Sequence, residues 1–155
     1  MRSDRKAETV QVSINEEREL DDIHVDIRCP RVDERVGRIV ANLEAFDRRL
    51  VGKRDGSTHL LDATQVLYAE AVDRRVFVYT AEGVYETALR LYEIEDGLSA
   101  LDFVRISKQT IVNFSKVRAI KPDFNARLQL VLDNGEAVIV SRQYSGAIKR
   151  KIGAF

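Results

Sequence analysis

Short apolar segments separated by turn signals fill the chain from residue 48 onward, and this rhythm limits the fold more than any other feature. Residues 50–54 and 58–61 flank Asp55-Gly56, a dipeptide that favours the two-residue turn of a β-hairpin. Residues 66–70 and 75–79 flank a second turn at residues 72–74, and another strand begins at Val84-Tyr85 after the turn at Glu82-Gly83. Alternation predicts later strands at residues 117–121, 126–132 and 138–140. We therefore expect a mainly β domain over residues 48–155.

Two short helices are expected inside this domain. Leu91, Ile94 and Leu98 have the spacing of one helical face, and Gly97 is placed to cap the C-terminal end of that helix. Ser141 is placed to cap the start of a second helix, which closes the chain with the basic residues 149–151.

The first 47 residues follow a different pattern. Residues 9–14 and 23–27 alternate with period two and predict two strands, and residues 31–46 carry apolar side chains at helical spacing. This β-β-α extension is much shorter than the phosphoacceptor domain of a two-component regulator. We expect residues 1–47 to serve packing or dimerisation, or to act as a structural cap on the second domain.

One stretch, residues 103–113, joins an apolar strand to a polar and cationic cluster. Val104 and Ile106 are expected to face inward, and Arg105, Ser107, Lys108 and Gln109 to face outward. Arg and Lys side chains suit guanine and Gln suits adenine, so such a cluster can span phosphate and base edge. Residues 141–144, Ser-Arg-Gln-Tyr, repeat the pattern after the last strand. The alternative for the first cluster is a solvated strand-to-helix junction with a Ser or Thr cap.

The charge is divided between the two parts of the chain. The 155 residues have a formal net charge of zero, yet residues 101–155 contain ten Lys/Arg and four Asp/Glu, a net of +6. Residues 1–100 contain fifteen Lys/Arg and twenty-one Asp/Glu, a net of −6. This separation indicates one face suited to an anionic partner and a distal part that repels it.

Several classes of protein are disfavoured by what the sequence lacks. His24, His59 and Cys29 have no metal-ligand spacing, and neither a Gly-rich phosphate loop nor a G-x-S-x-G elbow is present. We therefore expect no catalysis, no metal and no cofactor. The single cysteine excludes an intramolecular disulfide, and neither an export signal nor an apolar run of membrane-spanning length is present, so a cytoplasmic protein is expected.

The order of these segments resembles the LytTR family of DNA-binding domains of bacterial transcriptional regulators. The resemblance rests on residues 66–70, Tyr85, the helix ending near Leu98, residues 103–113, residues 130–135 and residues 140–144, about two thirds of the chain. It implies an elongated stack of small antiparallel sheets with short helices, here preceded by the β-β-α extension. Its loops would enter successive major grooves of double-stranded DNA at repeated half-sites.

The resemblance also implies which side chains contact DNA. The family's contact loops fall on the turn at Asp73-Arg74, on Lys108 and Gln109, and on Arg142, while Arg75, Lys116 and Lys149 are expected to hold phosphates. Ser107 and Tyr144, from the two polar clusters, complete the set. Relatives often carry His-Arg-Ser-Tyr where this chain has Ser-Lys-Gln-Thr at residues 107–110, so a different base sequence is expected to be read.

These features predict a stand-alone, sequence-specific transcriptional regulator that forms a homodimer and has no receiver domain. Two alternatives remain. A β-rich protein-interaction module would use the basic edge to bind an acidic partner, and it would bind any DNA weakly and equally. An RNA-binding module is disfavoured because exposed aromatic residues do not gather on one predicted sheet.

Overall fold

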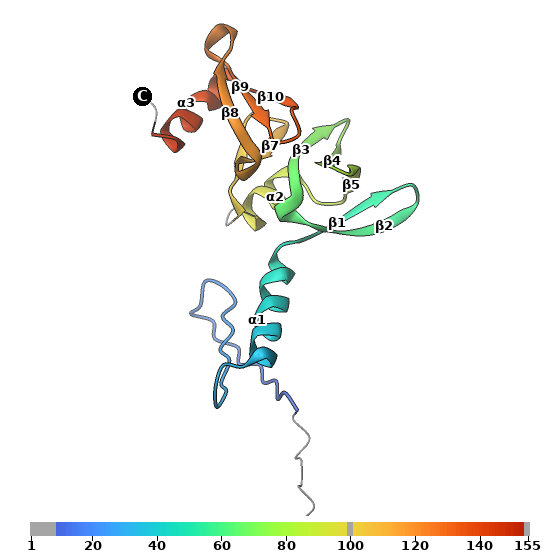
Figure 1. Cartoon of the computed structure of the whole chain (residues 1–155), viewed down its shortest axis with the longest axis vertical. Coiled ribbons are helices and arrows are strands. Elements are labelled where there is room, and N and C mark those ends of the chain that lie inside the picture. The colour runs from blue at the N-terminus through green and yellow to red at the C-terminus, as the bar shows by residue number, and fades with distance from the viewer. Residues whose placement is uncertain (1–8, 99–100, 154–155) are drawn as a thin grey trace, which may run out of the picture. The chain divides into compact units, whose positions relative to one another are not determined.

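The computed structural model describes residues 9–98 and 101–153 (Figure 1). The chain divides into two units, residues 1–32 and residues 33–155. No helix in the described ranges is long and apolar enough to cross a membrane.

Helices and strands occupy most of the second unit. The three α-helices are α1 (Glu34–Asp47), α2 (Leu91–Gly97) and α3 (Arg142–Lys151). The ten strands described are β1 (Arg49–Arg54), β2 (Ser57–Asp62), β3 (Val66–Val72), β4 (Arg75–Thr80), β5 (Gly83–Thr87), β6 (Phe103–Arg105), β7 (Thr110–Asn113), β8 (Val117–Pro122), β9 (Leu128–Leu132) and β10 (Ala137–Val140). Short 3-10 turns follow β2, β7 and β8, at Ala63–Gln65, Phe114–Lys116 and Phe124–Ala126.

The strands form two antiparallel sheets. The larger has the order β2-β1-β5-β4-β3-β7-β6, and the smaller has the order β10-β9-β8. The predicted mainly β fold is confirmed, and so are the two tight hairpins. Asp55 and Gly56 have φ of 50° and 75°, and Asp73 and Arg74 have φ of 50° and 64°. Positive φ at both central residues is the mark of a type I′ turn, whose twist matches that of the flanking strands.

The seven-stranded sheet is buried on both faces along β7. Ile111 and Val112 are consecutive and fully buried, yet they belong to different apolar clusters, because neighbouring side chains on a strand point to opposite faces. One cluster includes Ile94 of α2 and Leu98, which caps that helix. The other includes Leu130 of the small sheet and Ile148 of α3. Strand β7 therefore lies between α2 on one face and the small sheet with α3 on the other.

Polar bonds also fasten the small sheet to the large one. Tyr68 of β3 donates its hydroxyl to Glu136, in the β9–β10 connection, at 3.1 Å. Burial, followed by the neighbouring Glu136 carboxylate, raises the pKa of Tyr68 well above its ordinary value, so the phenol stays protonated and remains a donor. The ring of Tyr68 stacks on Tyr79 with a centroid separation of 4.3 Å. The Tyr68–Glu136 hydrogen bond therefore joins β3 of the large sheet to the β9–β10 connection of the small sheet.

The predicted strands at residues 9–14 and 23–27 are absent. The described residues 9–33 contain neither helix nor strand, and the apolar residues of the alternating pattern stay in solvent, with Val12 82%, Ile14 91% and Ile23 87% exposed. Two isolated strands gain too little from pairing to persist without a core to cover. The predicted helix at residues 31–46 is confirmed as α1, so only the last part of the β-β-α extension is regular.

Three local predictions also need correction. Gly97 is the last residue of α2 rather than its left-handed cap, and Leu98 takes the cap position with φ of −117°. Ala126 does not extend β9, because it lies in a 3-10 turn with φ of 60°. Residues 103–113 form a strand, a loop and a second strand, so the alternative of a strand-to-helix junction is wrong.

Candidate nucleic-acid interface

The loop of residues 106–109, called here the central loop, connects β6 to β7. The main-chain N–H groups of Ile106 and Ser107 both donate to the Thr110 carbonyl, at 3.0 and 3.3 Å. The Ser107 hydroxyl oxygen accepts from the N–H of Gln109 at 3.2 Å. Ile106 is fully buried and anchors the loop, whereas Lys108 and Gln109 are exposed. The central loop is thus a tight, internally bonded turn that presents two polar side chains to solvent.

Main-chain hydrogen bonds join the central loop to both other predicted contact loops. The N–H of Ala71, near the end of β3, donates to the Gln109 carbonyl at 2.8 Å. The β3–β4 turn with Asp73 and Arg74 starts two residues later. On the other side, the N–H of Ser141 donates to the Ile106 carbonyl at 2.9 Å, and Arg142 follows directly. Segments far apart in sequence are therefore brought together around residues 106–109.

Arg74 occupies the second central position of the β3–β4 turn and is exposed. Its φ of 64° lies in the left-handed region that glycine adopts most easily. The equivalent position of the β1–β2 turn is Gly56. An arginine at such a position has a conformational cost, which is consistent with a role for its side chain.

Arg75 is exposed, but its guanidinium is already engaged. Its Nε and Nη2 atoms donate to the two carboxylate oxygens of Glu86 on β5, at 2.8 and 2.5 Å. These hydrogen bonds hold the pKa of Glu86 below its usual range. The guanidinium also lies 5.2 Å from the ring centroid of Phe77. Arg75 is thus held on the sheet surface beside the turn.

Arg142 is the first residue of α3 and is exposed. Ser141 occupies the N-cap position as expected, yet its side chain makes no capping bond. Its carbonyl instead accepts from the N–H and the hydroxyl of Ser145, at 3.0 and 3.1 Å. Tyr144 is half-buried and packs against the second apolar cluster, so its ring contributes to the core.

Lys116 and Lys149 lie away from the central loop. Lys116 ends the 3-10 turn that follows Asn113, at the opposite end of β7. Hydrogen bonds from Thr64 lower the pKa of Asp62 there, and the charge of Lys116 adds a smaller effect in the same direction. Lys149 is in the last turn of α3, two residues before Lys151. Lys151 pairs with Asp102 and lies 5.2 Å from the Phe114 ring centroid, again at that end of the β6–β7 hairpin. The structure thus gathers Arg74, Ser107, Lys108, Gln109 and Arg142, with Arg75 beside them.

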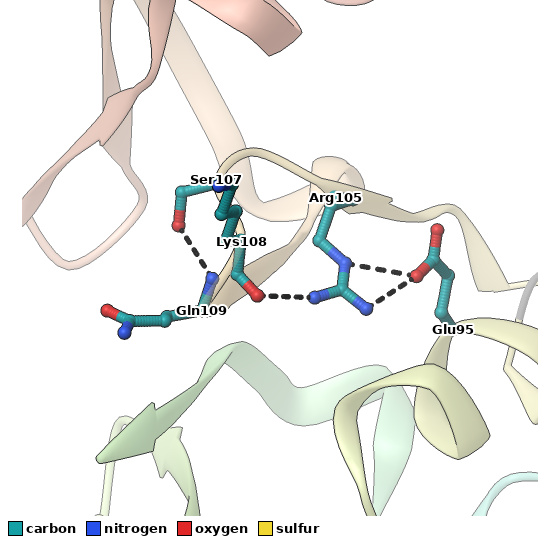
Figure 2. Close-up of polar contacts among 5 residues, drawn as sticks. All are labelled: Glu95, Arg105, Ser107, Lys108 and Gln109. Carbon is teal, nitrogen blue, oxygen red and sulfur yellow. Dashed lines mark hydrogen bonds and ion pairs between the residues drawn. The ribbon is translucent and has the colours of Figure 1, made fainter. Parts of the chain in front are cut away.

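Arg105 was expected to face outward, and this is wrong. Its side chain is only 19% exposed and forms an ion pair with Glu95 of α2 (Figure 2). One signal in the sequence pointed to this burial. Arg105 alternates with Phe103, a core residue, so both share the sheet face that α2 covers.

Asn113, at the end of β7, is a fully buried structural residue. Its side-chain amide donates to the carbonyls of Val66 and Thr64, at 2.9 and 3.4 Å. Its side-chain oxygen accepts from the N–H and hydroxyl of Ser115, at 3.2 and 2.6 Å. Asn113 therefore joins β7 to the start of β3.

The gathered side chains suit a polyanion with exposed base edges better than a small ligand. No group of three or more His, Cys, Asp or Glu side chains in the described part of the chain could hold a metal ion. The exposed cationic side chains of Arg74, Lys108 and Arg142, with the amide of Gln109, can instead bond phosphates and base edges.

Comparison with known proteins agrees with this chemistry. Residues 56–153 match the family described as the LytTr DNA-binding domain. The chain is 29% identical to a solved LytTr DNA-binding domain of a methyl-accepting/DNA response regulator from Bacillus cereus, with a TM-score of 0.65. That match covers 68% of this chain and 97% of the other.

Longer matches come from Staphylococcus aureus. Proteins of strains NCTC 8325 and MRSA252, both described as uncharacterised HTH-type transcriptional regulators, are 28% and 27% identical over 131 residues. Each match covers 83% of this chain and 88% of the relative. In the described ranges of this chain, strands separate α1, α2 and α3, so no two α-helices follow each other as a helix-turn-helix. The match over residues 56–153, more than half of the chain, shows that this protein belongs to the LytTR family of DNA-binding domains.

Proposed function

We propose that the protein is a transcriptional regulator that binds double-stranded DNA in a sequence-specific manner and catalyses no reaction. The observation that carries this proposal is the pair of main-chain hydrogen bonds, Ala71 to Gln109 and Ser141 to Ile106, that gather three cationic loops. The names of the Staphylococcus aureus relatives support the regulatory role. The cytoplasm is the compartment in which such a protein would meet DNA.

Within this proposal the side chains divide into three groups. Arg74, Lys108, Gln109 and Arg142 read base edges in the major groove, since they are exposed and stand on two loops and a helix start that backbone bonds join. Arg75, Lys116 and Lys149 contact phosphates, which position the protein without reading sequence. Ser107 shapes the central loop through Gln109, and Tyr144 fixes the start of α3 through its packing.

The proposed division of labour assigns residues 48–155 to DNA binding and residues 1–47 to packing or dimerisation. Two protomers on repeated half-sites would raise affinity without new contacts, because the second binding event becomes intramolecular. The apolar residues Val40 and Leu43 of α1, 37% and 41% exposed, support an interface between two copies.

Fluorescence anisotropy tests the proposal. A duplex from the region upstream of the protein's own gene is compared with a scrambled duplex over a salt series. We expect specific binding near ~10⁻⁸ M, at least ~10³-fold tighter than binding to scrambled DNA. Equal, weak binding that disappears as salt rises would indicate only a basic surface or the wrong operator. A selection from random sequences then decides, and failure to enrich any sequence would overturn the proposal in favour of a module that binds an acidic protein.

A further inference from the structure

Arg105 bonds the central loop from a side chain that is mostly buried, with 19% exposed. Its Nη1 atom donates to the Lys108 carbonyl at 2.8 Å (Figure 2). Its Nε and Nη2 atoms donate to one carboxylate oxygen of Glu95, at 3.1 and 2.9 Å. A single guanidinium therefore connects the main chain of the loop to helix α2.

The other end of this connection is rigid. Glu95 follows Ile94, which is 1% exposed, and Leu98 is 6% exposed, so α2 is anchored in the first apolar cluster. A planar guanidinium donates in fixed directions and cannot lose its proton near neutral pH. The carbonyl of Lys108 is thus held in place by a donor that is itself held by the core.

Arg105 is a poor candidate for direct DNA contact. Its side chain is only 19% exposed, whereas that of Arg75, which is also paired with a carboxylate, is 59% exposed. Lys108 and Gln109, by contrast, are exposed on the same loop. Arg105 thus fixes the main chain of the loop, whereas Lys108 and Gln109 are placed to contact a partner.

We infer that Arg105 is a positioning residue that sets sequence specificity by fixing the backbone from which Lys108 and Gln109 meet the DNA bases. This inference rests on the proposed function. A reading side chain discriminates between bases only if its own backbone is fixed, because a mobile loop can adjust to the wrong base. Arg105 therefore acts on the ratio of specific to non-specific binding rather than on electrostatic attraction.

The test is a double-mutant cycle with Arg105→Gln and Lys108→Ala, measured with the duplex enriched by selection and with its scrambled form. Arg118→Gln, at an exposed arginine of β8, is the charge-matched control. We expect Arg105→Gln to lower the specificity ratio about 5- to 150-fold, the range of one base contact, while the salt slope stays that of wild type. In the Lys108→Ala background, the same change should have little further effect on specificity.

A measurement on the free protein distinguishes this inference from the proposed function. Hydrogen exchange of the Ser107 and Gln109 amides, which donate to the Thr110 carbonyl and the Ser107 hydroxyl, should quicken in Arg105→Gln, while amides of β9 keep their protection. Arg105→Lys, which retains the charge but loses the planar fork, should give an intermediate result and serves if Arg105→Gln does not fold. Additive effects in the cycle, or unchanged loop exchange, would overturn the inference. Failure of selection to enrich any sequence would overturn the proposed function alone, because the exchange data report on the loop without DNA.

Discussion

Arg142 and Lys149 stand on the same helix but are proposed to act differently. Arg142, at the start of α3, is next to the central loop through Ser141, and an arginine there can bond guanine with two hydrogen bonds. Arg142→Ala is expected to weaken specific binding by about 1–3 kcal/mol and to relax the preference at one base position.

Lys149, in contrast, is expected to contact phosphate. Lys149→Ala should weaken binding to all duplexes alike and make the salt slope shallower by about one. Anisotropy with a panel of single-base variants of the duplex checks both effects. If both variants bind as wild type does, the proposed interface is in the wrong place.

Asn113 provides a prediction about stability alone. Its amide group is fully buried with bonds to Val66, Thr64 and Ser115. Asn113→Ala removes these buried hydrogen bonds, so it is expected to lower the free energy of unfolding by about 1–3 kcal/mol. Urea unfolding measures the loss, with Asn42→Ala on the exposed surface of α1 as the control. Equal stability of the two variants would show that the bonds of Asn113 contribute nothing.

Among the elements, the two type I′ hairpins differ in the residue at the second central position of the turn. The β1–β2 turn uses Gly56 where the β3–β4 turn uses Arg74, although both backbones have positive φ. Arg74→Gly removes the steric cost of that conformation but adds freedom to the unfolded chain, so stability should stay within about 1 kcal/mol of wild type. Affinity for the specific duplex should fall by about 1–3 kcal/mol, because the guanidinium is lost. A melting curve and a titration, run on the same sample, separate the two effects, and unchanged affinity would remove Arg74 from the interface.

The contact between β4 and β5 gives a pH dependence. The Arg75 hydrogen bonds depress the pKa of Glu86 in the folded state, so the stability they contribute is present above the unfolded carboxyl pKa. That contribution is lost as pH falls through the lower, folded pKa. The difference in urea midpoint between wild type and Glu86→Gln should therefore shrink on acidification from pH 7 to pH 3. A difference that grows on acidification would contradict the assignment.

Local patterns predicted the elements better than they predicted how the elements meet. Asp55-Gly56 and the alternation of residues 128–132 suffice to define a hairpin and a half-buried strand, because both depend on near neighbours. The same alternation wrongly predicted a strand at residues 9–14, because period two indicates a strand only where one face of that strand packs on a core. The bonds from Ala71 to Gln109 and from Ser141 to Ile106 join distant segments, so no local pattern could reveal them. Only the resemblance to the LytTR family indicated that the three contact loops act together, because their spacing in the sequence does not show it.

In the molecule as a whole, helix α1 keeps apolar side chains in contact with solvent. This helix has 14 residues, and an isolated helix of about 12–15 residues is only marginally stable in water. Val40 and Leu43 are partly exposed on it. A second copy of the chain would bury such side chains and would also place two DNA-binding domains on one duplex.

The double variant Val40→Gln/Leu43→Gln tests the proposed dimer without changing the net charge. Removing two apolar side chains from the interface is expected to weaken dimerisation about 10- to 100-fold, because their burial supplies part of the association energy. Exchanges at exposed polar positions of the same helix, Arg38→Gln and Asn42→Gln, should leave the dimer intact.

Light scattering over a range of concentrations measures the effect, and binding to duplexes with one or two half-sites shows its consequence. The double variant should lose the advantage of the second half-site while its affinity for a single half-site stays that of wild type. The proposed dimer would be wrong if the wild-type protein is monomeric at high micromolar concentration and binds a two-site duplex one copy at a time. Helix α1 would then be a packing element of its own chain.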